Sequence, residues 1–393
     1  MVESIGLVIK PRRSAHAKSL QGLVEFLAVA QWVLGFLFMG ISGFVVFAYL
    51  FYTLLKHWFW LVIITTGLGP LPFTNGYVYE MSVSILLTTF IIWYSYYWQN
   101  DLGAEDRGSH PWMRLRYLGL WDRLANYFPI QLVLSDELLQ STSSGSLDSL
   151  DINSSDRTLL LSPGENYLVG YHPHGVFSTG AFVNFMTEAT GFQKAFPGMK
   201  PWLAVLKAHF KSPFYRDYLM ALGIVAATKN SLSYLLDSSQ CHQTGNFVVV
   251  VVGGAPEALE AHPGQYKLVI QQRYGFFKLA LQTGSSLIPC FSFGEQQMYK
   301  QVDNQAGTFL RKCQDWFTQI STFAIPLFYA RGPFPYRAPI NTVIGAPIKC
   351  ERVDNPSPEQ VQQLKKTYLE HLQRLFQRYK PIYDPSAHDI EFI

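Results

Sequence analysis

NFVVVVVGG, residues 246–254, is the stretch of sequence that decides the fold. Five consecutive valines follow an aromatic residue, and the run stops at two glycines. An uninterrupted β-branched run is typical of a parallel strand that is covered on both faces, whereas a strand with one wet face alternates apolar and polar residues. The stretch therefore predicts an α/β domain with a mainly parallel sheet.

The segments on either side repeat this pattern of a short apolar run that ends at a glycine or proline. Helical segments lie between and after these runs. The last one has a strong start signal, because Ser357, Pro358 and Gln360 fit the cap, first-turn and capping-box positions. The predicted strands are 166–171, 246–254, 285–294 and 340–347, and the predicted helices are 181–192, 274–284 and 357–380.

The N-terminal quarter of the chain has a different character. Residues 26–55 contain no charged side chain, and about 20 apolar residues are enough to cross a bilayer as a helix. A second apolar region begins at Trp58, is interrupted by the Gly- and Pro-containing stretch 67–76, and resumes over 81–98. We expect a transmembrane helical hairpin here. The alternative is a buried helical pair in a soluble protein.

The distribution of charge predicts the orientation of this hairpin. Basic residues flank it at 10–18 and 107–123, and the connection between Lys56 and Glu80 is almost free of them, so both ends are expected in the cytosol. The net charge of +3 is too small to indicate nucleic-acid binding. Four scattered cysteines without CxxC spacing fit a reducing compartment. The expected organisation is a cytosolic N-terminal segment 1–25, a membrane hairpin 26–98 and a cytosol-facing domain 99–393 with a polar loop at 136–157.

The loop GYHPHGVFSTG, residues 170–180, carries two histidines directly after a predicted strand. His172 and His174 have a spacing that can bind a metal, but a catalytic zinc needs a third protein ligand and no ligand motif supplies one. Ser178 lacks the GxSxG spacing of a hydrolase nucleophile. A neutral imidazole can instead take a proton from a hydroxyl as that oxygen attacks a carbonyl. The residues alone leave open that both histidines have only structural contacts.

Several longer blocks support one family resemblance. They are YHPHG (171–175) with GAFVNFMTEAT (180–190), NYFPIQL (126–132), VVGGAPEAL (251–259), RYGFFKLAL (273–281), LIPCFSFGE (287–295) and ARGPFPYRAPINTVIGAPI (330–348). In this order they resemble the acyl-CoA:diacylglycerol acyltransferase type 2 family, which includes monoacylglycerol and wax-alcohol acyltransferases. The resemblance covers roughly residues 20–385. The stretch between Gly332 and Pro339 is shorter than the family pattern, which puts the choice of acceptor in question.

The resemblance implies transfer of a fatty acyl group from acyl-CoA to the free hydroxyl of diacylglycerol. We expect His174 to be the general base, because it lies next to Gly175 and farther from the strand end. His172 is the second candidate and is expected to orient the loop. Glu257 is expected to orient His174, as a carboxylate does in hydrolase triads. A thioester is already activated, so no covalent acyl-enzyme is required.

Acyl-CoA is expected as a co-substrate, with no permanently bound cofactor and no metal. Acylglycerols and membrane lipid are the expected partners, and a homo-oligomer is left open. The expected location is the endoplasmic reticulum membrane, as a multi-pass protein, with lipid droplets as a second location. The alternatives are a monoacylglycerol or fatty-alcohol acceptor and a non-catalytic lipid-binding membrane protein. The residues expected to bind acyl-CoA are Gly175, Arg273, Lys278, Arg331 and Arg337.

Overall fold

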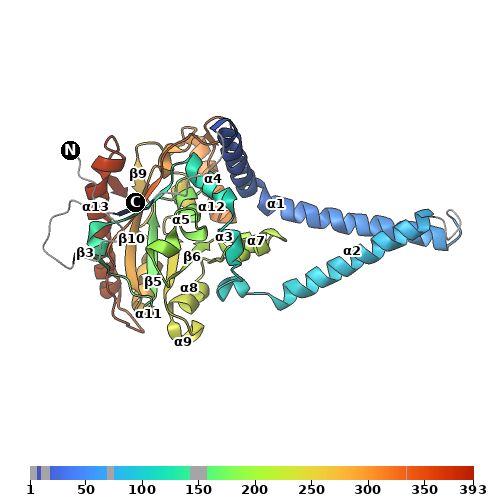
Figure 1. The fold of residues 1–393 in the computed structure, drawn as a ribbon, viewed down its shortest axis with the longest axis horizontal. Coiled ribbons are helices and arrows are strands. Elements are labelled where there is room, and N and C mark those ends of the chain that lie inside the picture. Colours follow the sequence, from blue (N-terminus) through green and yellow to red (C-terminus); the bar gives the residue numbers. More distant parts are fainter. Residues whose placement is uncertain (1–6, 10–17, 69–74, 142–156, 333) are drawn as a thin grey trace.

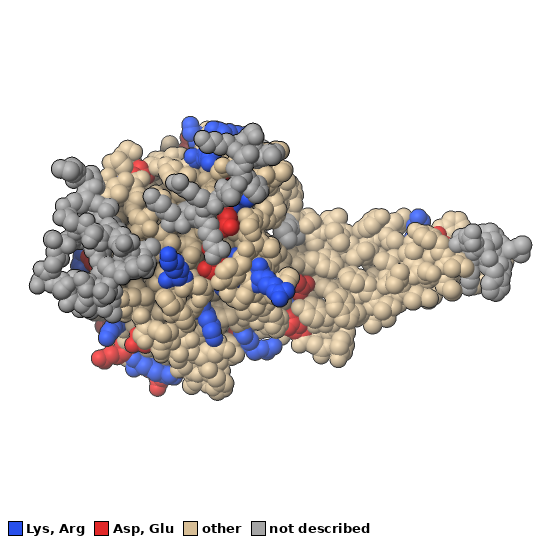
Figure 2. Space-filling model, in the orientation of Figure 1, with Lys and Arg blue, Asp and Glu red and all other residues tan. Residues whose placement is uncertain are grey.

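The structure is a computed structural model of residues 1–393, and it describes all of them except 1–6, 10–17, 69–74, 142–156 and 333. Figure 1 shows a sheet between helices, from which two long helices, α1 (Lys18–Thr65) and α2 (Asn75–Asn100), project together to one side. In Figure 2 this helical arm is almost free of charged atoms, whereas lysines, arginines and acidic residues are distributed over the α/β body. The two parts therefore present different surfaces to their surroundings.

The described residues form an eight-stranded sheet with the order β1-β2-β13-β10-β5-β8-β6-β7. The five strands β10, β5, β8, β6 and β7 run parallel to one another, and β13 runs parallel to β2. Antiparallel pairing in the described part of this sheet is limited to β1 with β2 and β10 with β13. The prediction of an α/β domain with a mainly parallel sheet is confirmed. The strands of this sheet are β1 (Leu7–Ile9), β2 (Gln131–Leu134), β5 (Tyr167–His172), β6 (Lys200–Val205), β7 (Ile224–Ala226), β8 (Asn246–Val251), β10 (Ser286–Phe293) and β13 (Asn341–Ile344).

Helices cover both faces of the sheet, and each face has its own apolar core. One core joins the sheet to the beginning of α1 and to α4, α5 and α7, and the other joins it to α8, α11 and α13. The valines of β8 divide between the two cores, Val249 on one side and Val248 on the other, and both are fully buried. This explains why that run shows no polar alternation. The main helices are α4 (Gly119–Tyr127), α5 (Thr179–Met186), α7 (Tyr215–Ala221), α8 (Lys229–Leu236), α11 (Tyr274–Thr283), α12 (Phe309–Ser321) and α13 (Pro358–Tyr383).

Short elements complete the domain around the sheet. Three two-stranded sheets pair β11 with β12, β14 with β9, and β3 with β4. The predicted polar loop 136–157 lies largely outside the described residues, and its described ends form β3 and β4. The short elements are β3 (Leu139–Ser141), β4 (Arg157–Leu159), β9 (Tyr266–Leu268), β11 (Lys300–Gln301), β12 (Phe328–Tyr329), β14 (Ile390–Phe392), α3 (Met113–Arg116), α6 (Phe192–Ala195), α9 (Ser238–Cys241), α10 (Gly254–Ala258) and the 3-10 turns η1 (Ala104–Asp106), η2 (Asp136–Leu138), η3 (Lys207–Lys211) and η4 (Glu295–Gln297).

The helical arm contains two segments that are long and apolar enough to cross a membrane, Gly40–Thr65 and Val78–Asp106. Only 17% and 11% of their apolar windows are buried, so the alternative of a buried helical pair does not fit. We conclude that the protein associates with a membrane through these helices. The segment 26–55, which was expected to cross the membrane, only partly overlaps the first candidate span, Gly40–Thr65. Its first part does not belong to the span, because Ala28, Val29 and Val33 are fully buried against the α/β domain.

The predicted strands all appear, but one predicted helix was wrong in its length. Helix 181–192 was expected to be continuous, whereas α5 ends at Met186 and the separate α6 begins at Phe192. Thr187 takes an extended backbone after α5, with φ −132° and ψ 164°, and its hydroxyl donates to the carbonyl oxygen of Val183 at 2.6 Å. A β-branched residue whose side chain satisfies the last turn is a reasonable place for a helix to stop.

Candidate active site

Three neighbouring parallel strands end at one edge of the sheet and carry the reactive groups of the site. The central strand β5 runs into His172 and the histidine loop, which we define as residues 172–180. The turn after β8 carries Glu257, and the turn after β10 carries Glu295. Carboxyl ends of adjacent parallel strands are where α/β sheets place their ligands and catalytic groups. The sheet therefore brings together residues that are far apart in the sequence.

The geometry of His174 assigns a role to each of its ring nitrogens. Nδ1 lies 2.9 Å from the carbonyl oxygen of Gly175. A carbonyl oxygen can only accept, so Nδ1 carries the proton and Nε2 keeps its lone pair. Burial lowers the pKa of His174, while the hydrogen bond to Gly175 raises it by a smaller amount. The imidazole is therefore neutral at pH 7, with Nε2 as the basic nitrogen.

His172 has different surroundings although it is two residues away. Its side chain is fully buried, and its Nε2 lies 3.1 Å from the hydroxyl of Tyr368 on α13. That hydroxyl also donates to the carbonyl oxygen of Gly170 at 3.2 Å. Burial lowers the pKa of His172 to about 3, so the ring stays neutral at every physiological pH. Its contacts are those of a residue that fixes the end of β5 against α13.

Glu257 holds the histidine loop through the backbone. Its Oε1 accepts the amide N–H of His174 at 2.6 Å, and its Oε2 accepts the amide N–H of Val269 at 2.8 Å. Arg273 lies close by and donates from Nη2 to the carbonyl oxygen of Gly253 at 2.7 Å. Burial raises the pKa of Glu257 to about 7, against the two amide hydrogen bonds and the charge of Arg273, which lower it. The carboxylate thus fixes where His174 sits, and its described contacts are with amides rather than with the imidazole.

Glu295 holds the other end of the same loop. Its Oε1 accepts the Tyr171 hydroxyl at 2.8 Å and the amide N–H of Gly180 at 2.5 Å. Burial raises the pKa of Glu295 to about 7, and the hydrogen bonds lower it by less. A Cβ on Gly175, whose φ is +61°, would meet the Glu295 Cβ at 3.1 Å and its Oε2 at 3.2 Å. Glycine is therefore required at position 175 both by its left-handed backbone and by the closeness of Glu295.

Comparison of the chain with known proteins identifies its family. Residues 152–392 match the family described as diacylglycerol acyltransferase. The chain is 40% identical over 311 residues to 2-acylglycerol O-acyltransferase 1 of Mus musculus, covering 77% of this chain and 84% of that protein. It is 38% identical over 332 residues to diacylglycerol O-acyltransferase 2B of Umbelopsis ramanniana, covering 81% and 87%.

The chain belongs to the diacylglycerol acyltransferase family. A third relative, diacylglycerol O-acyltransferase 2 of Danio rerio, is 36% identical over 376 residues, covering 94% of this chain and 87% of that protein. The resemblance drawn from the sequence blocks is confirmed, and the protein is an O-acyltransferase. No solved protein structure shows a significant match to the chain.

The structure gathers some of the residues predicted for this acyltransferase site and separates others. His172, His174, Gly175, Glu257 and Arg273 lie together around the histidine loop. The remaining three predicted cations lie elsewhere: Lys278 is exposed on α11, Arg331 is exposed beside β12, and Arg337 binds Glu25 of α1, with 3.0 Å between Nη2 and Oε2.

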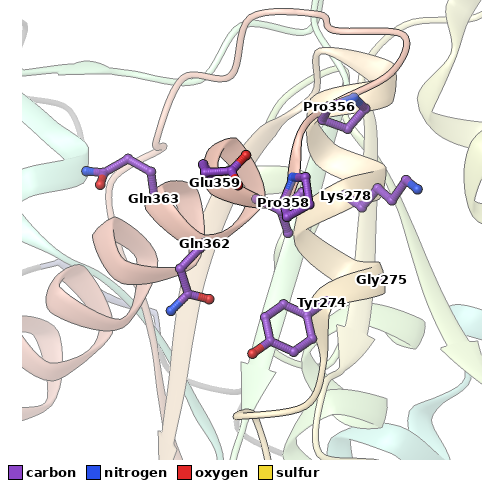
Figure 3. A pocket seen from close by; sticks show the side chains of 9 residues that line it. Tyr274, Gly275, Lys278, Pro356, Pro358, Glu359, Gln362 and Gln363 are labelled. Carbon is purple, nitrogen blue, oxygen red and sulfur yellow. The ribbon is translucent and has the colours of Figure 1, made fainter.

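An open groove of 760 Å³ lies between α11 and the first turns of α13. Figure 3 shows Tyr274 and Lys278 of α11 beside Pro358 and Gln362 of α13. None of the residues that line this groove belongs to the histidine loop, so we assign the active site from the strand-end groups and not from this hollow. Within the described part of the chain, no group of three or more His, Cys, Asp or Glu side chains is arranged to hold a metal ion.

Sequence reasoning missed two residues that contact the site. Glu295 closes the block LIPCFSFGE directly after a strand, the same signal by which Glu257 was found after the valine run, so it was open to the same argument. Tyr368 has no such signal, because it lies in the middle of the long helix α13 and follows no strand. Its hydroxyl reaches His172 across 196 positions of sequence.

Proposed function

We propose that this diacylglycerol-acyltransferase family member transfers a fatty acyl group from acyl-CoA to the free hydroxyl of diacylglycerol, with His174 as general base. The observation that carries the proposal is the hydrogen bond from Nδ1 of His174 to the Gly175 carbonyl, which leaves Nε2 as an unprotonated base. His174 is therefore the better candidate of the two, because the residue as a whole is half-buried and its Nε2 has no described hydrogen-bond partner, whereas Nε2 of His172 is bound to Tyr368.

The reaction needs no covalent intermediate on the protein. The acceptor hydroxyl gives its proton to Nε2 of His174 while its oxygen attacks the thioester carbonyl carbon. The carbon–sulfur bond then breaks, and the thiolate of CoA takes the proton from the imidazolium. The amide hydrogen bonds to Glu257 and Glu295 hold the loop at both ends during these steps, which keeps the base in line with the two substrates.

Substitution of His174 tests the base directly. His174→Gln should lower acyl transfer from labelled oleoyl-CoA by about 10²–10⁴-fold, the usual contribution of a general base. His388→Gln, at an exposed histidine outside the site, is the matched control and should retain full turnover. Because burial lowers the pKa of His174 below 6.5, the acidic limb of the activity profile should lie below pH 6.5. Full turnover by His174→Gln in membranes would remove His174 from the mechanism.

A second acceptor, 2-monoacylglycerol, is favoured by the relatives named 2-acylglycerol O-acyltransferase, one of them 40% identical to this chain. Membranes containing the full chain should therefore be offered diacylglycerol, 2-monoacylglycerol and a long-chain alcohol in competition for one labelled acyl-CoA. Our proposal expects triacylglycerol to be the main product. Diacylglycerol as the main product would move the assignment to the second acceptor without affecting the role of His174.

We also propose that Arg273 and the backbone at Gly175 contribute to acyl-CoA binding, because both lie at the histidine loop. Arg273→Gln should raise the KM for acyl-CoA more than it lowers kcat, since a guanidinium pairs with phosphate. Lys278→Gln and Arg331→Gln serve as comparisons, because both cations are exposed on other elements. An equal effect of all three substitutions would indicate a diffuse charge effect.

The endoplasmic reticulum membrane, with both ends of the chain in the cytosol, is the location we propose, with lipid droplets as a second one. Arg107 and Arg114 are exposed just beyond the second candidate span, whereas residues 66–80 contain neither Lys nor Arg. This distribution follows the positive-inside rule. A glycosylation acceptor inserted between residues 66 and 74 should be modified only if the hairpin tip reaches the lumen.

A further inference from the structure

Helix α12 has its apolar and polar faces reversed relative to a helix that packs on a domain. Phe309, Cys313, Trp316 and Ile320 recur at helical spacing along one face, and all four are exposed. Phe309 is 83% exposed, Trp316 64% and Ile320 67%. An amphipathic helix in a soluble domain turns such a stripe towards the core. We refer to these four residues as the α12 stripe.

The face of α12 that contacts the domain carries polar side chains together with the half-buried Leu310 and Phe317. Gln314 is buried, donates to the carbonyl oxygen of Ile325 at 2.9 Å and accepts from Asn304 at 3.2 Å. Arg311 pairs with the mostly buried Glu260, with 2.5 Å between Nη2 and Oε1. These polar contacts fix the rotation of the helix, so the stripe cannot turn inwards without leaving buried polar groups unpaired.

The segment after α12 connects the helix, through η3, to the root of the membrane hairpin. The segment after α12 places Phe323 against His209 of η3, with 5.1 Å between ring centroids. Ser212, directly after η3, donates to the carbonyl oxygen of Gly40 at 2.6 Å, and Gly40 begins the first candidate span. In Figure 1 the hairpin leaves the domain on the side of α12 and α7, whereas α13 covers the opposite side. Helix α12 thus lies on the side of the domain from which the hairpin projects.

We propose that α12 lies in the surface of the same membrane that the hairpin enters, with the α12 stripe inserted among the acyl chains. The stripe then holds the α/β domain against the bilayer. Exposed apolar side chains continue beyond the helix at Ile325, Leu327 and Tyr329, and Lys312 at the edge of the stripe is placed to reach anionic headgroups.

The membrane contact of α12 would bring the bilayer surface close to the histidine loop. Phe328 of β12 packs on Phe177 of the histidine loop, with 5.2 Å between ring centroids, and both contact Tyr299. The membrane-facing segment therefore lies one aromatic layer from the loop that carries His174.

The test uses the full chain in phospholipid vesicles, with an environment-sensitive fluorophore on Cys313. Cys241 and Cys290 are buried, so Cys350→Ser leaves Cys313 as the accessible thiol. We expect a blue-shifted emission, strong quenching by brominated lipids and weak quenching by aqueous iodide. The matched control carries Cys313→Ser, Cys350→Ser and Lys366→Cys, which moves the label to the exposed face of α13; its label should respond to iodide and not to brominated lipid.

A second variant tests whether the α12 stripe contacts lipid or another protein molecule. Phe309→Ser with Trp316→Ser changes only exposed side chains of the helix, so the fold is retained, and lipid quenching of the Cys313 label should fall markedly. Iodide quenching at Cys313 equal to that at Lys366→Cys would overturn the proposal. Efficient bismaleimide cross-linking of Cys313 between two copies at high lipid-to-protein ratio would also overturn it, because the occupant would then be a second copy of the chain.

Discussion

The turns after β8 and β10 each place a buried glutamate against the histidine loop, but the two carboxylates are satisfied differently. Glu257 uses one oxygen for the amide of His174 and the other for the amide of Val269. Glu295 receives both the Tyr171 hydroxyl and the Gly180 amide on Oε1, and in the described part of the chain its buried Oε2 has no hydrogen-bond partner. A proton can therefore occupy Oε2 of Glu295 without displacing a donor, whereas either oxygen of Glu257 would lose one.

The two glutamates therefore hold the histidine loop in different ways: Glu257 depends on its negative charge, and Glu295 depends on its position and packing. Glu257 has Arg273 nearby and needs both oxygens as acceptors, so its ionised form is the one that fits. Glu295 accepts the hydrogen bonds from Tyr171 and Gly180 on one oxygen, with a further backbone contact to Thr179 that lowers its pKa, so its neutral form can keep the bonds from Tyr171 and Gly180. Both groups have a pKa raised to about 7 by burial, yet only one of them should depend on its charge for the contacts that it makes.

Among the residues that hold the histidine loop, the largest effect is expected for Glu257→Gln. The new NH₂ group must face the amide of either His174 or Val269, which leaves a buried N–H without an acceptor and costs about 1–3 kcal/mol of stability. Displacement of the loop by about 1 Å should lower turnover by about 10²-fold. Turnover in nanodiscs and the midpoint of thermal unfolding measure both effects, with exposed Glu370→Gln as control. Unchanged turnover would show that the loop does not depend on this carboxylate.

Gly175→Ala probes the β10 side, where shape is expected to matter. The left-handed backbone costs a residue with a Cβ about 1–2 kcal/mol, and the new methyl carbon would lie 3.1 Å from Cβ of Glu295. We expect about a tenfold loss of turnover, since His174 shares the displaced peptide. Gly264 also has a left-handed backbone, with φ +74°, but open space around it. Gly264→Ala therefore measures the cost of the left-handed backbone alone. Equal losses in both variants would mean that closeness to Glu295 is unimportant.

The pH dependence of stability tests the raised pKa values. Glu295, whose neutral form keeps its hydrogen bonds, holds its proton in the folded state up to about pH 7, whereas the unfolded chain releases it near pH 4.5. The folded state then binds more protons, so stability should fall as pH rises from 4.5 to 7, by at most about 1.4 kcal/mol per pH unit for this group. Chemical denaturation in detergent between pH 5 and 8 measures the slope. Glu295→Gln should flatten it, because the amide does not titrate.

Glu295→Gln is expected to have the smallest effect on activity at pH 7. Its amide oxygen can retain the hydrogen bonds from Tyr171 and Gly180, and its NH₂ group occupies the place of the unpartnered Oε2. Turnover should stay within about twofold of the unsubstituted chain, in line with a near-neutral isosteric exchange. A loss as large as that of Glu257→Gln, measured in the same nanodiscs, would remove the distinction between the two anchors.

Four strands of the described eight-stranded sheet, β5, β8, β10 and β13, could be predicted because their signal is local, whereas β1, β2, β6 and β7 were not predicted. The valine run and its glycines are enough to specify a covered parallel strand, and strand-end reasoning led to His174 and Glu257. Glu295 was accessible to the same reasoning. The choice between the two histidines was not accessible to sequence reasoning, because His172 and His174 flank one proline and have the same chemistry. The contact between His172 and Tyr368, 196 positions away, separates them.

The amino-acid sequence by itself determined the periodic features: apolar runs long enough for a membrane, a covered parallel sheet and a histidine loop at a strand end. These follow from the spacing of side chains along a helix or strand. Only the tertiary structure decided which partner each side chain meets. Arg337, a candidate for phosphate, pairs with Glu25, and α12 turns a stripe of apolar side chains outwards while its buried Gln314 bonds within the domain. The physical reason is that periodicity fixes which residues share a face, while packing against distant segments fixes where that face points.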